Sequence, residues 1–379
     1  MFLLVDVENP LIIVSRKMTS GVLLASLPTI SPRPASVKVG SSISKFRVHV
    51  SGIYGREAVR GGGCSCYGGG VEKRRRREQN VDGDLFVDNA CIDCDTCRWM
   101  APSVFSRVDG MAAVSKQPES KEDQLSALQA LISCPTSSIH TKKLAQDIPE
   151  VCNTFPIPID SKKILGVYHC GHHSKYSYGA ASYLIVHPEG NILVDSPRYS
   201  EKLARNIEML GGARYMFLTH KDDVADHEKW AKRFSCKRIL HAREIEVGTA
   251  NVEMKLEGNG PWSLSHDIDL IHTPGHSEGS VCLFYKSLNI LFTGDHLAMT
   301  ASGLDITDQY NHYSVPLQLK NVERLLYLDF LWLLPGHGRR IQFKDVRDKN
   351  CSIKTYLADR GHRLASEDED QLITSDVTI

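Results

Sequence analysis

Short apolar runs separated by polar turns dominate the chain between residues 160 and 345. Runs of this kind are typical of buried strands, whereas longer stretches with apolar residues at every third or fourth position are typical of helices. The expected strands are Ile164–Tyr168, Ser182–Val186, Ile192–Val194, Tyr215–Leu218, Arg238–Leu240, Leu270–Ile271, Val281–Phe284, Ile290–Phe292 and Leu331–Leu334. The expected helices are Glu201–Leu210, Ala225–Phe234 and Leu317–Leu326. This alternation predicts an α/β fold in which helices cover the faces of sheets.

A smaller domain is expected before this one, over residues 81–150. Its clearest element is a short helix over Gln124–Ile132, where leucines recur at helical spacing just before Cys134. After the larger domain, residues 346–379 are expected to form a terminal helix around Ile353–Leu364 and a solvated tail with the acidic run Glu367–Asp370. The chain is therefore expected to contain two folded domains.

The first eighty residues have a different composition. From Asn9 to Arg56 the chain has no acidic residue, while basic, hydroxyl and proline residues are frequent. This composition is typical of a transit peptide, so residues 1–56 are expected to be disordered and to direct the protein to the chloroplast, with the mitochondrion as the alternative. Residues 57–80 read as a Gly/Arg-rich linker, and the basic run Lys73–Arg77 is expected to be solvated because no aromatic residues alternate with it.

Charge and metal-binding residues narrow the function classes. Lys plus Arg equals Asp plus Glu at 45 each, so no overall positive field favours nucleic acid or a membrane surface. The expected partner is a small-molecule substrate. The chain has 11 cysteines and 16 histidines, which are the side chains that hold borderline and soft metals.

Four cysteines have the spacing of an iron-sulfur site. Cys91, Cys94 and Cys97 recur at intervals of three, and Cys134-Pro135 follows after a gap. Three close thiolates and one remote Cys-Pro match the ligation of a [4Fe-4S] cluster, although zinc also accepts four thiolates. The stretch resembles a bacterial-type ferredoxin domain in its single-cluster form, because Ala101-Pro102 stands where a second cluster would need its cysteine.

Histidines and aspartates follow the ends of four expected strands. His220, Asp222 and the pair Asp226-His227 follow the first, His276 the second, Asp295-His296 the third and His337 the fourth. Loops that leave one edge of a sheet bring distant residues together. The sequence therefore predicts a metal site at this edge.

This set resembles the metallo-beta-lactamase superfamily in its glyoxalase II-like branch, over about Lys162 to Ile341. The resemblance implies an αββα sandwich with two divalent metal ions. The first ion is expected on His220, Asp222 and His276, the second on Asp226, His227 and His337, with Asp295 bridging them. Asp222, or else Asp223, replaces a histidine of the family motif. The ions are expected to be Zn or Fe, possibly Mn, and this carboxylate favours Fe or Mn over Zn relative to the usual family pattern.

A two-metal site of this kind is expected to hydrolyse a thioester or ester by a metal-bridging hydroxide. Asp226 is the residue expected to help orient the water, and His296 is the first candidate for a general acid, ahead of His312 and Tyr313. The loop Cys170–Gly179 is expected to act as a substrate flap, and its histidines are not needed as ligands.

The alternative is an oxidoreductase that receives electrons from the [4Fe-4S] cluster. A di-iron site would resemble the flavodiiron proteins, which carry a carboxylate at the position of Asp222. A mono-iron site on His220, His276 and Asp295 would resemble the persulfide dioxygenases. This hypothesis adds an electron-transfer partner to the small-molecule substrate.

Overall fold

Two β-sheets stacked face to face form the centre of the larger domain in the computed structural model, which describes residues 74–361. The seven-stranded sheet has the order β11-β10-β9-β8-β7-β6-β5, and the six-stranded sheet the order β12-β13-β14-β15-β18-β19. The strands of the first are β5 Ile157–Pro158, β6 Val167–His169, β7 Tyr183–Ile185, β8 Ile192–Val194, β9 Tyr215–Phe217, β10 Lys237–His241 and β11 Met254–Leu256. Those of the second are β12 Trp262–Ser263, β13 Ile268–His272, β14 Val281–Tyr285, β15 Ile290–Gly294, β18 Trp332–Pro335 and β19 Ile341–Gln342. From β8 to β11 neighbouring strands run parallel, and β15 also runs parallel to β18.

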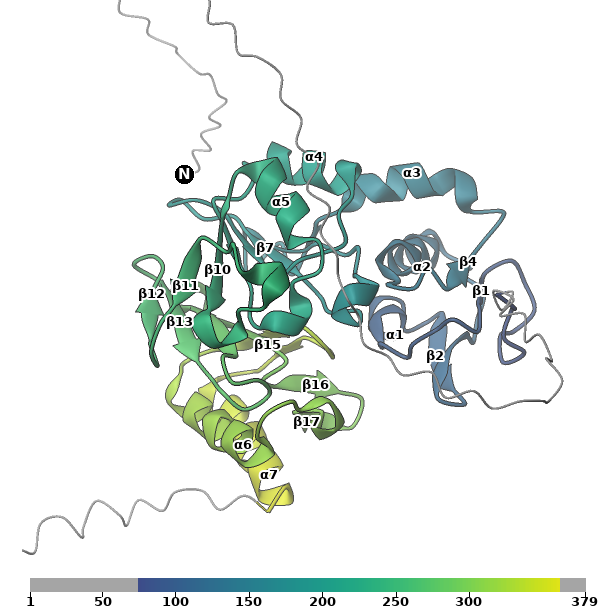
Figure 1. Cartoon of the computed structure of the whole chain (residues 1–379). Helices are drawn as coiled ribbons and strands as arrows, with labels where there is room; N and C mark the ends of the chain where they lie inside the picture. Colours follow the sequence, from purple (N-terminus) through teal and green to yellow (C-terminus); the bar gives the residue numbers. More distant parts are fainter. Residues whose placement is uncertain (1–73, 362–379) are drawn as a thin grey trace, which may run out of the picture. The chain divides into compact units, whose positions relative to one another are not determined.

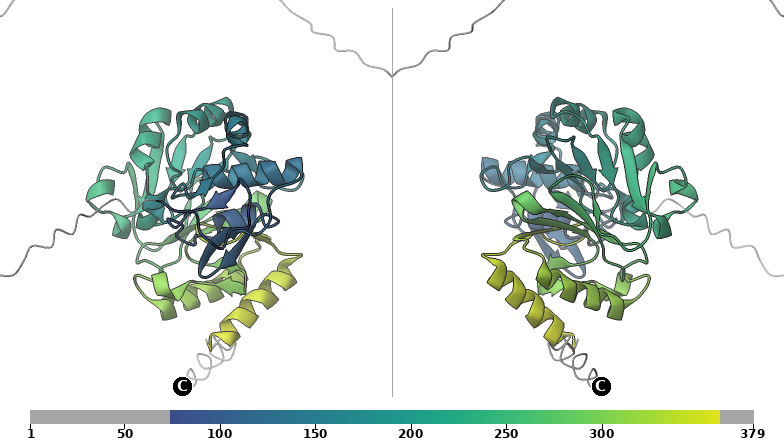
Figure 2. Two further views of the ribbon diagram at one scale, coloured as in Figure 1. Left: turned by 90° about the vertical axis from the view of Figure 1, so that its right-hand side faces the viewer. Right: turned by 90° about the vertical axis from the view of Figure 1, so that its left-hand side faces the viewer.

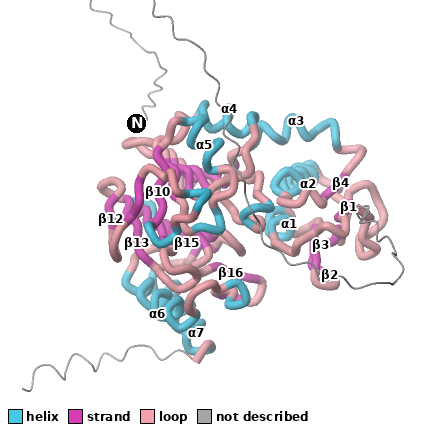
Figure 3. The backbone as a smooth tube through the Cα atoms, viewed as in Figure 1, coloured by secondary structure: helices cyan, strands magenta, loops and turns pink. Residues whose placement is uncertain are grey.

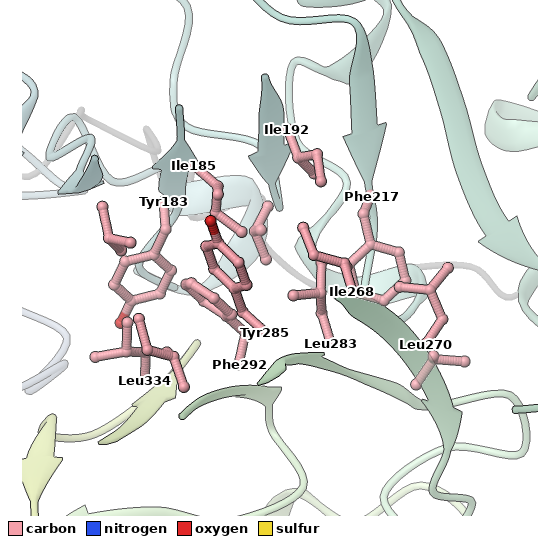
Figure 4. Packing of buried hydrophobic residues seen from close by; sticks show 14 of the residues in the cluster. Tyr183, Ile185, Ile192, Phe217, Ile268, Leu270, Leu283, Tyr285, Phe292 and Leu334 are labelled. Carbon is pink, nitrogen blue, oxygen red and sulfur yellow. The ribbon is translucent and has the colours of Figure 1, made fainter. Parts of the chain in front are cut away.

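The apolar core lies between the two sheets, as Figure 4 shows. Successive side chains of a strand point to opposite faces, so Tyr183 and Ile185 face this core while Leu184 between them faces the outer layer. Phe217 and Phe292 from opposite sheets are fully buried in it. Each such side chain contributes about 1.5–3 kcal/mol relative to an exposed one, so the stacked sheets are a rigid support for the loops at their edges.

Helices cover the outer face of each sheet (Figures 1 and 2). The seven-stranded sheet is covered by α4 Glu201–Met209 and α5 His227–Phe234, and the six-stranded sheet by α6 Val315–Arg324 and α7 Val346–Asp359. Helix α4 begins where the Ser200 hydroxyl accepts a hydrogen bond from the Leu203 amide, and Ser314 caps α6 in the same way. The predicted αββα sandwich is confirmed.

The smaller domain precedes the sandwich, as Figure 3 shows. Its buried side chains form a core of their own. Its elements are β1 Phe86–Val87, α1 Thr96–Met100, β2 Phe105–Val108, β3 Met111–Val114, α2 Lys121–Ser133 and β4 Ile139–His140. Helix α2 belongs to both domains, because Ala127 and Ala130 face the small core while Leu128 and Ile132 pack into the layer outside the seven-stranded sheet. The small domain is therefore joined to the sandwich by apolar packing.

Several sequence expectations change in the structure. The first expected strand begins at Val167, because Ile164 lies in a turn, and α7 begins at Val346, well before the expected Ile353. The expectation of a solvated basic run is wrong for Arg77, which is buried and donates to the carbonyl oxygens of Ala112 and Val108. The expected transit peptide, most of the expected linker and the acidic run lie outside the described residues. Among the helices of residues 74–361, none is long and apolar enough to cross a membrane.

Candidate metal centre and iron-sulfur site

The four predicted cluster cysteines line one hollow in the small domain. Cys91, Cys94 and Cys97 lie on the turn that leads into α1 and on its first residues, and Cys134 follows the last residue of α2. Pro135 favours an extended conformation for the residue before it, so the helix ends and the thiol of Cys134 turns toward the other three. The remaining walls include the apolar side chains of Val87 and Ile139.

The surroundings of these sulfur atoms suit thiolate ligands. The Ser138 amide donates to Sγ of Cys134 at 3.2 Å, and the Thr96 hydroxyl lies 3.4 Å from Sγ of Cys94. Burial raises the pKa of Cys94 to about 11, so a bare thiol would stay protonated at neutral pH. A bound metal cluster supplies the positive charge that a buried thiolate needs. The hollow, the hydrogen-bond donors and the four sulfur atoms therefore fit a [4Fe-4S] cluster.

A second group of possible ligands lies at one edge of the sandwich. His220 follows β9, His276 follows β13, and Asp295 follows β15, while Asp222 lies in the short turn Lys221–Asp223. Nε2 of His220 and Nε2 of His276 each lie 3.7 Å from Oδ2 of Asp222 and 3.7 Å from Oδ2 of Asp295. Four donors around a zinc ion at 2.0–2.1 Å would be about 3.4 Å apart, so the group is close to the size that one ion requires.

The buried atoms of this group that lack hydrogen-bond partners also suit a bound cation. Nε2 of His220, Nε2 of His276 and Oδ2 of Asp222 are buried and have no hydrogen-bond partner among residues 74–361. Leaving a buried polar atom unpaired costs about 1–3 kcal/mol, and charged groups cost more. Coordination of a metal ion would satisfy all three atoms at once.

His312 adds a donor at the rim. Its Nε2 atom lies 3.5 Å from Oδ2 of Asp222, and its side chain is 56% exposed. The His312 amide donates to the carbonyl oxygen of His276, which anchors this loop beside the ligands. Sequence reasoning treated His312 only as an acid candidate. The structure also groups it with Asp222 and His276 as a possible ligand.

A further group of possible ligands consists of Asp223, Asp295 and His337. Asp223 is fully buried, and neither of its carboxylate oxygens has a hydrogen-bond partner in the part of the chain that the structure describes. Burial and the neighbouring Asp295 raise the pKa of Asp223. Gly336 leaves room for both carboxylates beside its backbone, since a Cβ atom there would lie 2.8 Å from Asp223 Oδ2 and 3.0 Å from Asp295 Oδ1. Asp295 thus belongs to both groups, as a bridging ligand must.

The structure does not place Asp226 and His227 with these ligands. The carboxylate of Asp226 accepts a hydrogen bond from the Tyr199 amide and pairs with Lys229, and Nδ1 of His227 lies 3.1 Å from Arg238. Neither belongs to a ligand group within the described range. Asp223, at the end of the short turn Lys221–Asp223, lies with Asp295 and His337 instead. The expectation that Asp226 is a ligand that helps orient the water, and that His227 is a ligand, does not fit this arrangement.

The acid role expected for His296 is also not supported. Its side chain is only 1% exposed, and burial lowers its pKa to about 3. The imidazole is therefore neutral at pH 7 and is a poor proton donor. The side-chain amide of Gln318 donates to the backbone carbonyl oxygens of Asp295 and His296, so these two hydrogen bonds fix the backbone of this segment.

A buried hydrogen-bond network orients His220 from behind. Its Nδ1 atom lies 3.0 Å from the hydroxyl of Thr219, which in turn donates to the carboxylate of Asp195. Partners of this kind fix the ring and leave Nε2 free for a metal. Sequence reasoning missed Asp195, although it directly follows the buried strand β8 and so carries the same signal as the other strand-end residues.

The loop Cys170–Gly179, expected to be a substrate flap, lies between the two sites. A Cβ atom on Gly179 would lie 2.9 Å from Cβ of Cys94, and the carbonyl oxygen of Ser177 accepts a hydrogen bond from Nε2 of His337. His172 and His173 are buried, whereas Tyr176 and Tyr178 are 71% and 68% exposed. Lys175, Tyr176 and Tyr178 are the exposed residues of this loop and are thus available to a substrate.

Comparison with known proteins assigns both domains. Residues 87–141 match the profile of the 4Fe-4S single cluster domain of Ferredoxin I, and residues 178–337 match that of the metallo-beta-lactamase superfamily. The Bacillus subtilis (strain 168) protein named "Probable metallo-hydrolase YqgX" is 30% identical over 127 residues, which are 33% of this chain and 59% of that protein. The uncharacterized protein YmaE of the same organism is 24% identical over 158 residues, 40% of this chain and 58% of its own length. The chain thus spans less than two thirds of these relatives.

Solved structures of metallo-beta-lactamases match about half of this chain. A metallo-beta-lactamase from Pontibacter korlensis is 13% identical with a TM-score of 0.40, covering 50% of this chain and 95% of that one. A metallo-beta-lactamase family protein from Thermus thermophilus is 17% identical with a TM-score of 0.39, covering 52% of this chain and 79% of that one. By the two profile matches, residues 87–141 resemble a single-cluster 4Fe-4S ferredoxin domain and residues 178–337 resemble a domain of the metallo-beta-lactamase superfamily.

Proposed function

We propose that the protein is a metal-dependent hydrolase that cleaves a thioester or ester. The observation that carries this proposal is the position of Asp295, which belongs both to the group with His220 and His276 and to the group with Asp223 and His337. When bound, two such ions lower the pKa of water to about 7 and polarise a carbonyl group. With three carboxylates among the ligands, iron or manganese is favoured over zinc.

The residues around this centre favour a substrate whose leaving group departs without being protonated. His296 is buried and neutral, and the exposed imidazole at the rim, His312, lies against Asp222. No dedicated proton donor is therefore evident among the described side chains at the centre. A thiolate departs without being protonated, which makes a thioester the preferred substrate class. His312 is placed to contact the substrate, while Thr219 and Asp195 hold His220 in position.

The test is a thioester and ester hydrolysis screen on the full chain with its metals quantified. The variant Asp295→Asn should lower kcat/KM at least about a hundredfold, because even indirect partners of metal ligands cost ten- to a hundredfold. Asp226→Asn is the matched control and should retain activity, since Asp226 bonds to Tyr199 and Lys229 instead. The proposal would be overturned if Asp295→Asn retained full hydrolysis. It would also be overturned if the wild-type protein with both metals bound hydrolysed no thioester or ester.

An oxidoreductase is the second candidate, and a specific observation favours it. The loop Cys170–Gly179 contacts the cluster ligand Cys94 at Gly179 and the metal-centre residue His337 at Ser177. Electrons from an external one-electron donor would have a short path through this loop. The two candidates separate on the need for redox chemistry, because an enzyme that is fully active with zinc in the centre and without a reductant is a hydrolase.

A further inference from the structure

The imidazole of His173 lies at the junction of the two sites. It is 1% exposed, and its Nδ1 atom lies 3.1 Å from the Thr96 hydroxyl of the small domain and 2.7 Å from the Gly179 carbonyl oxygen of the sandwich. Its Nε2 atom lies 2.8 Å from Nε2 of His169. All three contacts are buried, so each bond acts in a low-dielectric environment that strengthens it.

The hydrogen positions in this network follow from the acceptors. A carbonyl oxygen can only accept, so Nδ1 of His173 carries the hydrogen and faces both Gly179 and Thr96. Nε2 of His173 is then the acceptor, and His169 donates to it. The Thr96 hydroxyl accepts from His173, and Sγ of Cys94 lies 3.4 Å from it. The free Cys94 thiol donates to this hydroxyl, whereas a cluster-bound thiolate has no hydrogen and would accept the hydrogen of Thr96. His173 thus directs the Thr96 hydroxyl toward a cluster sulfur.

The same residue holds the segment that contacts the metal centre. The Gly179 carbonyl oxygen, which accepts from His173, lies two residues after Ser177, whose carbonyl oxygen accepts from His337. An unbroken path therefore runs from Cys94 through Thr96, His173 and this segment to a residue of the metal centre.

An ion pair separately links the loop that carries Cys94 to the loop that carries His337. Nε and Nη2 of Arg339 lie 2.7 Å and 3.2 Å from the carboxylate of Asp95. Arg339 is two residues after His337, and Asp95 directly follows Cys94. A two-pronged pair of this kind fixes orientation as well as distance, so the loops that carry Cys94 and His337 are held together.

We propose that His173 is a positioning residue through which reduction of the [4Fe-4S] cluster and metal binding at the hydrolase centre influence each other. Reduction adds one electron to the cluster from an external one-electron donor, and no bond or proton is exchanged. The more negative sulfur strengthens its hydrogen bond from Thr96, and the path through His173 transmits this change to His337. By linkage, a bound metal ion must shift the reduction equilibrium by the same factor. This regulation rests on the proposed metal centre, but not on the reaction that it catalyses.

The test is a redox titration of the full chain in which the EPR signal of the reduced cluster is monitored. The titration is done once with zinc bound at the hydrolase centre and once without zinc. Zinc has no redox chemistry, so only the cluster titrates. A tenfold coupling appears as a shift of about 59 mV in the midpoint potential. Wild-type protein should show a shift of this order, and Thr96→Val and His173→Ala should lose most of it. His173→Asn should recover part of the shift, because its side-chain amide can replace the Nδ1 donor.

Thr136→Val is the matched control. The Thr136 hydroxyl lies 3.7 Å from Sγ of Cys134 but bonds to Ser138, away from His173, so the zinc-dependent shift should persist. If His173→Ala does not fold, the result for Thr96→Val alone tests the proposal. This variant is expected to fold because valine has nearly the same shape as threonine. Equal midpoint potentials with and without zinc in the wild type, or a shift that survives both Thr96→Val and His173→Ala, would overturn the proposal. The titration contains no substrate, so a lack of thioester turnover would count against the hydrolase alone.

Discussion

Nδ1 of His337 lies 2.8 Å from both carboxylate oxygens of Asp295. Burial disfavours a charged imidazole, yet the Asp295 carboxylate raises the pKa of His337 to about 10. Burial likewise disfavours the charged carboxylate, yet His337 lowers the pKa of Asp295. In the metal-free protein the two residues therefore form an ion pair at neutral pH, in the place where a metal ion would bind.

Metal binding should consequently release a proton from His337. Because its pKa in the metal-free protein is raised, a cation must displace this proton at pH 7, and metal affinity should rise with pH until about pH 10. Zinc titration by calorimetry in buffers of different ionisation enthalpy measures the number of protons released. His337→Gln should release fewer protons than the wild type. Equal proton release by the two proteins would show that the pair is not protonated as described.

Asp223 should be needed for the second metal ion, and Asp226 should not. Asp223→Asn removes a buried carboxylate that faces Asp295 and His337, so about one metal equivalent per chain should be lost. Asp226→Asn should retain the full metal content, because that carboxylate is bonded to Tyr199 and Lys229. Elemental analysis after dialysis measures both variants. The opposite pattern would restore the assignment expected from the sequence.

Gly179→Ala should weaken the junction between the sites. The residue has φ +96°, and an added Cβ atom would lie 2.9 Å from Cβ of Cys94. Overpacking of this kind costs about 1–3 kcal/mol in the free energy of unfolding, and the clash should also lower cluster content. Gly258→Ala is the matched control, because it has φ +78° but no atom within 4 Å of the added Cβ. Urea unfolding and cluster absorbance should therefore separate the two variants. Equal losses in both would mean that backbone strain alone is responsible.

Arg77→Ala should destabilise the small domain. The guanidinium is buried and donates to the carbonyl oxygens of Ala112 and Val108, so its removal leaves buried acceptors without a partner. We expect a loss of about 1–3 kcal/mol in the free energy of unfolding, measured by urea denaturation. Arg75→Ala serves as control, since the Arg75 backbone amide makes its bond to Asn89 and the residue is exposed. If Arg77→Ala is as stable as the wild type, the hydrogen bonds of Arg77 do not contribute to stability.

The sandwich was predictable because its strands are short apolar runs and its ligands directly follow strand ends. His220, His276, Asp295 and His337 could be located from this pattern and from the resemblance to one superfamily. The role of Asp223 could not be read in the same way. It depends on a turn whose backbone conformation places two of three neighbouring aspartates, Asp222 and Asp223, at the centre and leaves Asp226 away from it, and single-sequence patterns do not determine that conformation.

The contacts between the domains were not predictable either. The positions of Thr96, His173 and Gly179 relative to one another depend on tertiary packing between segments far apart in the chain. Helix α2 shows the same limit, because its apolar pattern indicates a buried face but not that two separate cores share it. The burial of Arg77 was missed because charged runs are usually solvated.

The most direct test of the proposed function is the rate of thioester cleavage as metal-free protein with an intact cluster is titrated with a divalent metal. We expect no cleavage without metal and a rate that rises to a plateau at about two bound equivalents, because Asp295 joins two ligand groups. A rate that does not depend on added metal, or no cleavage when both sites are occupied, would show that the protein is not a two-metal hydrolase.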